Sequence, residues 1–129
     1  MKMIFKPGDQ KVYRKKVEAA DVAAFHGEVL HPVYSTFAMA RDFEWSSRLF
    51  FLEMRDIEEE GVGTFLSIEH KSPARVGDEV VITATIETIR GNELICVIEA
   101  ACNGKLIAKG KTGQKMLTLG RLQTLYNTR

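Results

Sequence analysis

The chain carries a hydroxyl, a carboxylate and an imidazole whose positions suit proton-transfer chemistry. Thr36 and Glu44 stand eight residues apart in a segment with helical periodicity, and His70 ends a later segment that alternates like a β-strand. A carboxylate can take a proton, an imidazole can carry one near neutral pH, and a hydroxyl can orient a reacting group. Because Glu44 lies at the edge of an apolar stripe, we expect the function to reside on this helix.

Each of these residues also has a purely structural explanation. Glu44 can pair on the surface with Arg48 one turn later or with Arg41 one turn earlier. Thr36 can merely cap the helix, and His70 can be a structural histidine whose hydrogen bonds are satisfied. Along one helix eight residues span about 12 Å, so Thr36 and Glu44 of one chain do not touch if both are helical. We therefore expect either a site shared between two chains or a Thr36 that precedes the helix.

The segment Val33–Ile57 is predicted to be a long helix that is apolar on two sides. One stripe contains Met39 and Phe43 among others, and a second ridge on roughly the opposite side begins at Trp45. A helix with two apolar sides is usually buried on both. Since a single sheet covers only one of these sides, we predict that a second copy of the chain completes the burial in a homodimer.

The boundaries of this helix are predicted from local signals. Ser35 or Thr36 is a suitable N-cap, and Gly61 is a suitable stop. Before the helix, the alanine-rich segment Glu18–His26 is expected to form a short helix.

The remaining periodic segments predict an antiparallel sheet. Gln10–Val17 is expected to be an edge strand, because its lysines suit an edge. After the long helix the period changes from 3.6 to 2, and a meander of about four strands follows, the first ending in His70 and the others spanning Glu79–Arg90, Glu93–Cys102 and Lys105–Leu117. The polar tail after them is expected to form a final turn of helix. One strand, one long helix and then a sheet predict a single α+β domain over residues 1–129.

Composition and charge exclude several function classes. The chain has 129 residues and a net charge of +1, which gives no electrostatic case for nucleic-acid binding. No apolar run reaches the length of a membrane span and no signal-peptide pattern is present, so we expect a cytoplasmic protein without a membrane partner. Cys96 and Cys102 lie about 20 Å apart on one predicted strand, too far for a disulfide. Three histidines without metal-binding spacing predict no metal site.

The order of elements and four residues at fixed spacings resemble a known family. A long central helix wrapped by an antiparallel sheet is similar to the hotdog fold. The motif VYST contains Thr36, and Glu44 follows eight residues later. The segment GVGTFLSIEH contains Gly63 and His70 seven residues apart, and the SPARVGDEV that follows is similar to the family's next loop. From about residue 31 to residue 116 the chain resembles the fluoroacetyl-CoA thioesterase-like family.

The resemblance implies a dimeric protein that hydrolyses a small or medium acyl-CoA thioester to CoA and a free acid. It implies Thr36, Glu44 and His70 as the catalytic set and Gly63 beside the thioester, with CoA as part of the substrate and no separate cofactor. Glu44 would act as base or as nucleophile, His70 as proton carrier and Thr36 as orienting donor. Backbone N–H groups near Gly63 or the helix start would hold the oxyanion. Fluoroacetyl-CoA itself is not implied.

Candidate substrate-binding residues form an apolar group and a basic group. The length of an acyl pocket would depend on the packing of Leu30, Phe37, Phe43 and Phe65. The phosphates of CoA need cationic partners, for which the candidates are Arg75, Lys109 and Lys111. The two lysines belong to a stripe with Lys105 and Lys115 that otherwise is typical of a solvated outer face of a sheet.

Two other function classes stay open from the sequence. A non-catalytic acyl-CoA-binding or sensing protein would bind CoA esters without hydrolysing them. A purely structural dimer would use Glu44 and His70 only to satisfy each other. The sequence also leaves open whether dimers associate further into a dimer of dimers.

Overall fold

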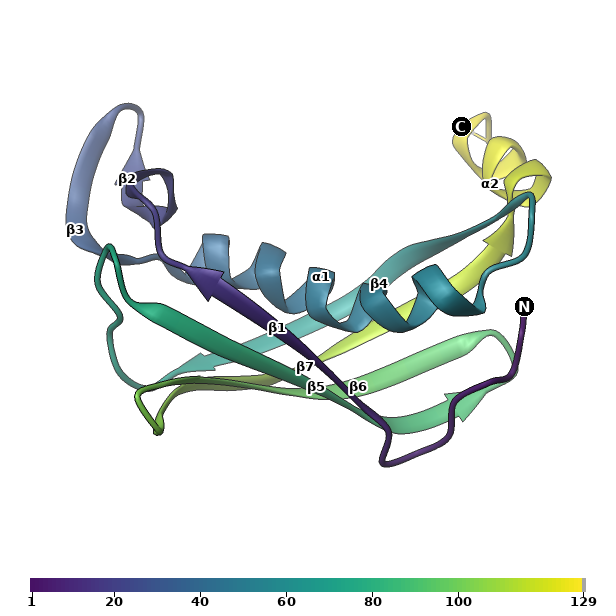
Figure 1. Ribbon diagram of the computed structural model, residues 1–129. Helices are drawn as coiled ribbons and strands as arrows, with labels where there is room; N and C mark the ends of the chain where they lie inside the picture. The colour runs from purple at the N-terminus through teal and green to yellow at the C-terminus, as the bar shows by residue number, and fades with distance from the viewer. Residues whose placement is uncertain (129) are drawn as a thin grey trace.

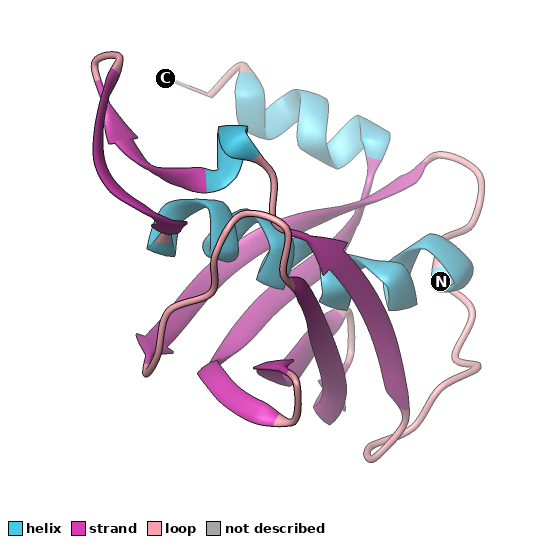
Figure 2. Cartoon of the chain, turned by 60° about the vertical axis from the view of Figure 1, so that its left-hand side comes forward, coloured by secondary structure: helices cyan, strands magenta, loops and turns pink. Residues whose placement is uncertain are grey.

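A five-stranded antiparallel sheet curls around one long helix in the computed structural model, which describes residues 1–128 (Figure 1). The elements in chain order are β1 (Gln10–Lys16), the 3₁₀ turn η1 (Ala19–Asp21), β2 (Val22–Phe25), β3 (Glu28–Tyr34), α1 (Thr36–Met54), β4 (Glu59–His70), β5 (Glu79–Arg90), β6 (Glu93–Cys102), β7 (Lys105–Thr118) and α2 (Leu119–Tyr126). The predicted α+β arrangement is confirmed. In Figure 2, α1 crosses the concave side of the sheet while α2 stands apart from it.

The strand order of the sheet is β1-β5-β6-β7-β4. β1 is an edge strand, as predicted, but the four later strands are not a simple meander, because β4 pairs with β7 instead of β5. Tight turns with positive φ at Gly91 and at Asn103-Gly104 hold β5, β6 and β7 together as neighbours. The longer loop between β4 and β5 contains no such two-residue turn, so it permits the crossover that leaves β4 at the second edge.

Helix α1 begins where the sequence predicted and ends earlier. Ser35 is its N-cap, and its hydroxyl accepts a hydrogen bond from the Ala38 N–H at 3.1 Å. The helix ends at Met54, so the prediction that it continues to Gly61 is wrong. Ile57 is 94% exposed in the turn that follows. The pairing of β4 with β7 already begins at Glu59, and this pairing competes successfully with two further helical turns.

The apolar stripe of α1 forms the centre of the core. Met39, Phe43, Phe50, Phe51 and Met54 are all buried against the concave face of the sheet. The facing side chains of β5 and β6 alternate with outward-pointing ones and are equally buried: Val80, Ile82, Ala84, Ile86, Leu94, Cys96, Ile98 and Ala100.

The second ridge of α1 is not covered within one chain. Trp45 is 40% exposed, and Leu49 and Leu52 are half-buried. The sheet of one chain therefore buries only one of the two apolar sides, as the sequence predicted.

The alanine-rich segment before α1 is not a helix. Apart from the short turn η1, it forms strand β2, which pairs with β3 through Ala23 and Ala24. The connecting residues His26 and Gly27 both have positive φ, the geometry of a tight hairpin turn. Helix propensity is a weak preference over so few residues, and pairing with β3 overrides it. In Figure 1 this hairpin projects beyond the N-terminal end of α1.

A polar cluster beneath this hairpin holds the start of α1. The Tyr34 hydroxyl donates to the buried Asp42 at 2.5 Å, and Arg41 binds both Asp42 and the buried Asp21. Burial and the Asp42 carboxylate raise the pKa of Tyr34, and hydrogen bonds to the two acids raise the pKa of Arg41. Burial alone would raise the pKa of Asp21, but hydrogen bonds led by the one from Arg41 hold it below its usual range.

The two cysteines do not form a disulfide with each other. Cys96 and Cys102 lie on the same strand, β6, and both are free thiols. Burial raises the pKa of the Cys96 thiol to about 12. Within residues 1–128, neither helix has the length and apolar content needed to span a bilayer.

Candidate active site

Thr36 and His70 meet within one chain. The Thr36 hydroxyl, in the first residue of α1, lies 3.2 Å from Nδ1 of His70, the last residue of β4. The other ring nitrogen, Nε2, lies 3.0 Å from the backbone oxygen of Ser72. A carbonyl oxygen only accepts, so Nε2 carries a proton, and in the neutral imidazole Nδ1 accepts from the Thr36 hydroxyl. The hydrogen bond from Nε2 to the Ser72 oxygen fixes the tautomer, and the two hydrogen bonds together fix the orientation of the ring.

Glu44 meets Gly63 about two turns further along the same helix. A side chain at Gly63 would collide with the Glu44 carboxylate, so the absence of a Cβ makes room for the acid. Both residues line a pocket of about 270 Å³ together with Arg41, Trp45, Arg48, Gly61 and Gln114. The carboxylate is thus held at the mouth of a pocket between α1 and β4.

The surface ion pair that the sequence allowed for Glu44 does not form. Arg41 binds Asp21 and Asp42, and Arg48 binds Glu60. Within residues 1–128 the Glu44 carboxylate takes part in no hydrogen bond or salt bridge. An acid next to two arginines but paired with neither is available to act on a ligand.

The Thr36–His70 pair and the Glu44–Gly63 pair stay apart within a single chain. Thr36 and Glu44 are both helical, so they are separated by about 12 Å along α1. Gly63 and His70 are separated by seven residues, or about 23 Å, along β4. The alternative that Thr36 precedes the helix is therefore wrong. One chain carries a hydroxyl–imidazole half and a carboxylate–glycine half, and it does not bring them together.

The apolar candidates for the acyl pocket have different environments. Phe43 is fully buried in the core, whereas Leu30, Phe37 and Phe65 are each about half exposed. Phe37 contacts the ring of Phe25 on the hairpin, with ring centroids 5.7 Å apart. Phe37 follows Thr36 at the start of α1, whereas Phe65 packs over Gly113 on the outer face of the sheet, the face that carries the lysines of β7.

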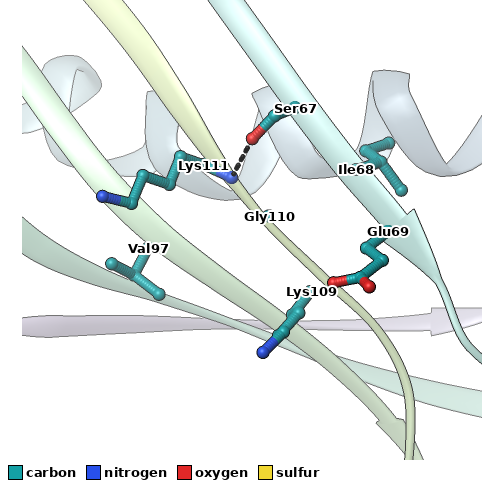
Figure 3. Close-up of a pocket in the computed structure, with 7 residues that line it drawn as sticks. All are labelled: Ser67, Ile68, Glu69, Val97, Lys109, Gly110 and Lys111. Atoms are coloured by element: carbon teal, nitrogen blue, oxygen red, sulfur yellow. Dashed lines mark hydrogen bonds between the residues drawn. The ribbon is translucent and has the colours of Figure 1, made fainter.

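The basic candidates lie on the other side of the sheet or in a loop. Figure 3 shows Lys109 and Lys111 beside a hollow over Gly110, which Ser67 also lines. The hollow measures about 440 Å³, and Lys111 binds Glu87 at 2.9 Å. Along β7 the lysines alternate with buried residues that face α1, so they point away from Glu44 and His70 of their own chain.

Arg75 lies in the loop after His70. Its side chain is exposed, and its backbone N–H bonds Asp78 at 2.9 Å. Of the three basic candidates, only Arg75 is close in the chain to a member of the hydroxyl–imidazole half.

The sequence interpretation missed Gln114. This residue of β7 pairs with Gly63 in the sheet register and lines the Glu44 pocket. Its side chain is 4% exposed, and its amide nitrogen lies 3.0 Å from the Ser47 hydroxyl. The available signal was a polar residue at an inward position of an alternating strand, between Thr112 and Met116.

Comparison with known protein families identifies the chain. A family model described as fluoroacetyl-CoA-specific thioesterase, FlK, matches residues 17–119. The chain belongs to this family. It is a thioesterase, and the predicted family resemblance is confirmed.

Solved structures confirm the hotdog fold of this FlK-family thioesterase. A Thermus thermophilus hypothetical protein described as a thioesterase superfamily member has a TM-score of 0.91 and 29% identity, over 98% of this chain and 93% of that chain. A hot-dog-like protein from Thermanaerovibrio acidaminovorans has a TM-score of 0.87 and 20% identity, over 95% of this chain and 90% of that chain. The fluoroacetyl-CoA thioesterase FlK has a TM-score of 0.85 and 18% identity, over 97% and 98%. No curated protein sequence gives a significant match.

Proposed function

We propose that this FlK-family thioesterase hydrolyses a small or medium acyl-CoA thioester to CoA and a free acid, at a site shared by two subunits. The observation that carries the proposal is the pair of complementary half-sites. One half has a hydroxyl bound to an imidazole of fixed tautomer, and the other has an unpaired carboxylate against a glycine. Proton transfer to and from a thioester needs both halves.

The free edge of β4 offers a way to join the halves. β4 is the last strand of the sheet, and its outer edge pairs with no other strand of residues 1–128. Unpaired edges readily pair with another chain. The midpoint between Gly63 and His70 falls between Leu66 and Ser67. An antiparallel pairing of two β4 strands centred near that midpoint would bring Gly63 close to the partner's His70, because the bulge between Gly63 and Phe65 puts Gly63 on the same inward face as His70. The exposed ridge of Trp45 would gain a cover.

In this arrangement each residue has a role that its chemistry supports. Glu44 acts as base or nucleophile toward the thioester carbonyl, next to a glycine that lets the substrate come close. The partner's His70 carries a proton, and the partner's Thr36 orients it through the hydrogen bond to Nδ1. The helix N-terminus that begins at Thr36 contributes free N–H groups for the oxyanion.

The substrate class is supported by the relatives. Structures of FlK variants are described in complex with fluoroacetate and CoA and with acetyl-CoA, at 18% and 16% identity to this chain. A 1,4-dihydroxy-2-naphthoyl-CoA thioesterase from Synechocystis shares 16% identity at a TM-score of 0.68. CoA is the common part of these substrates, and the half-exposed Leu30 and Phe37 suit an acyl group of modest size.

A panel of acyl-CoA esters with detection of released thiol tests the proposal. We expect the wild-type protein to turn over at least one short or medium acyl-CoA, and Glu44→Gln and His70→Ala each to lose at least about a hundredfold in kcat. Full activity of both variants would refute the assigned site. If CoA esters raise the Tm of the wild type and no thiol is released, the protein is an acyl-CoA-binding module instead.

A further inference from the structure

Gln114 has a fixed amide orientation beside the catalytic carboxylate. Its Nε2 donates to the Ser47 hydroxyl at 3.0 Å and to the backbone oxygen of Glu44 at 3.2 Å. Ser47 donates its own proton to that same backbone oxygen at 3.1 Å, so both partners of Nε2 act as acceptors. Flipping the amide would set its oxygen against the backbone oxygen of Glu44, which is also an acceptor, so the observed orientation is favoured and the amide oxygen points elsewhere.

That oxygen is a buried acceptor without a donor. Oε1 of Gln114 is inaccessible and accepts no hydrogen bond from residues 1–128, although the side chain lines the Glu44 pocket. A buried carbonyl oxygen without a donor is costly, and such groups are normally satisfied by protein or by water. The site therefore calls for a donor that residues 1–128 do not provide.

The Glu44 carboxylate, which lines the same pocket as Gln114, cannot provide that donor. Gln114 and Gly63 are opposite each other in the β7–β4 register, and side chains at such positions lie about 4.5–5.5 Å apart. At Gly63 the side-chain space is filled by the Glu44 carboxylate. Gln114 thus stands beside the carboxylate, and an amide oxygen and an ionised carboxylate are both acceptors.

A water molecule satisfies two such acceptors at once, because it has two protons to donate. We propose that Gln114 and Glu44 together hold the water that attacks the thioester, and that Glu44 is the general base. The inference rests on the proposed thioesterase site. The water oxygen forms a bond to the carbonyl carbon as its proton passes to Glu44. The C–S bond then breaks, and the partner's His70 carries the proton from Glu44 to the CoA thiolate, which gives the acid and CoA.

The test compares Gln114→Met with Thr112→Val. Methionine keeps the length of glutamine and removes the amide. Thr112 lies on the same inward face of β7 and also has a buried hydroxyl without a partner, but it does not line the Glu44 pocket. With the best acyl-CoA of the panel, we expect Gln114→Met to lose about tenfold or more in kcat with KM nearly unchanged, and Thr112→Val to keep the wild-type kcat. Equal kcat for Gln114→Met and wild type would overturn the proposal.

A double variant separates this role from simple support of the fold. If Gln114 acts through the water that Glu44 activates, Gln114→Met should cost almost nothing further in a Glu44→Gln background. Single-turnover rates at high enzyme concentration provide the measurement. A further full loss in the double variant would show independent action and overturn the proposal.

Two results distinguish the failure of this inference from the failure of the thioesterase assignment. An inactive wild type refutes the proposed function itself. A different result refutes only the general-base role: the wild type is active and depends on Glu44, but quenched Gln114→Met carries an acyl adduct on Glu44. A nucleophilic carboxylate would accumulate that adduct when the attacking water is lost. We expect the quenched variant to have an unmodified mass.

Discussion

Mixed dimers offer the sharpest test of a site shared between subunits. Within one chain, Thr36 and Glu44 are separated by about 12 Å of helix, and Gly63 and His70 by about 23 Å of strand. If two chains complete the site, a dimer of one Glu44→Gln chain and one His70→Ala chain has one intact site. The other site carries both defects.

The expected rate follows from counting sites. Random mixing of the two variants makes about half of the dimers mixed, each with one of two sites intact, so the mixture should recover about one quarter of the wild-type rate. Mixed dimers purified through two different affinity tags should reach about one half. Each parent variant alone should stay at least about a hundredfold below wild type, which makes the recovery easy to detect by thiol release.

A matched mixed dimer gives the opposite result. One wild-type chain paired with one Glu44→Gln/His70→Ala chain has no intact shared site, since each site would contain one damaged half. It should be nearly inactive. If each chain instead held a complete site, this dimer would keep half of the rate and the first mixed dimer would show none. That exchange of results would refute the shared site.

Three further predictions concern single residues. Gly63→Ala brings a Cβ against the Glu44 carboxylate. Because that carboxylate ends a flexible side chain, Tm should fall by only a few degrees, while kcat/KM should fall about tenfold or more. An unchanged kcat/KM would contradict this geometry. Ser35→Ala removes the N-cap bond and should lower the free energy of unfolding in urea by about 1 kcal/mol. Because Ser35 is buried, Ser35→Thr, which keeps the hydroxyl, should restore most of this loss, and Ser35→Val, which lacks it, should not. Asp21 has a folded-state pKa below its ordinary 3.8, so its carboxylate stabilises the fold above pH 3.8 and this contribution disappears as the pH falls through the lowered pKa. Asp21→Asn should therefore lower the free energy of unfolding by about 2 kcal/mol at pH 7, and by progressively less below pH 3.8, as measured by urea titrations. A difference between wild type and variant that does not change with pH would argue against the ion pair with Arg41.

Local turn chemistry explains which parts of the fold were predictable. The turns at Gly91 and Asn103-Gly104 fall in the short gaps between the predicted strands that became β5, β6 and β7, and their positive φ values are those that tight hairpins require. The N-cap at Ser35 was equally local. By contrast, the place of β4 beyond β7 depends on which sheet edge remains free after the hairpins have formed, and no residue of β4 encodes this.

Competition between local preference and pairing explains the two errors in helix assignment. The segment before α1 is rich in alanine, yet β3 lies within pairing distance across the turn at His26 and Gly27. The residues after Met54 continue an acidic, helix-compatible run, yet Glu59 pairs with Thr118 at the far end of β7. In both cases pairing with another strand, which the sequence did not predict, outweighs an intrinsic helix propensity of a few tenths of a kcal/mol per residue.

The candidate site could be predicted as residues but not as an assembly, and the reason is geometric. The family motifs predicted Thr36, Glu44, Gly63 and His70 as candidates, because each motif lies within a single element. Gln114 escaped notice because its position beside Glu44 depends on the β4–β7 register, which the sequence did not predict. The rises of helix and strand keep the two half-sites apart for any choice of rotamers. If the site is shared as proposed, one chain is incomplete as a catalyst on its own. We expect its partner to bind along the edge of β4 between Gly63 and His70, which pairs with no other strand of residues 1–128.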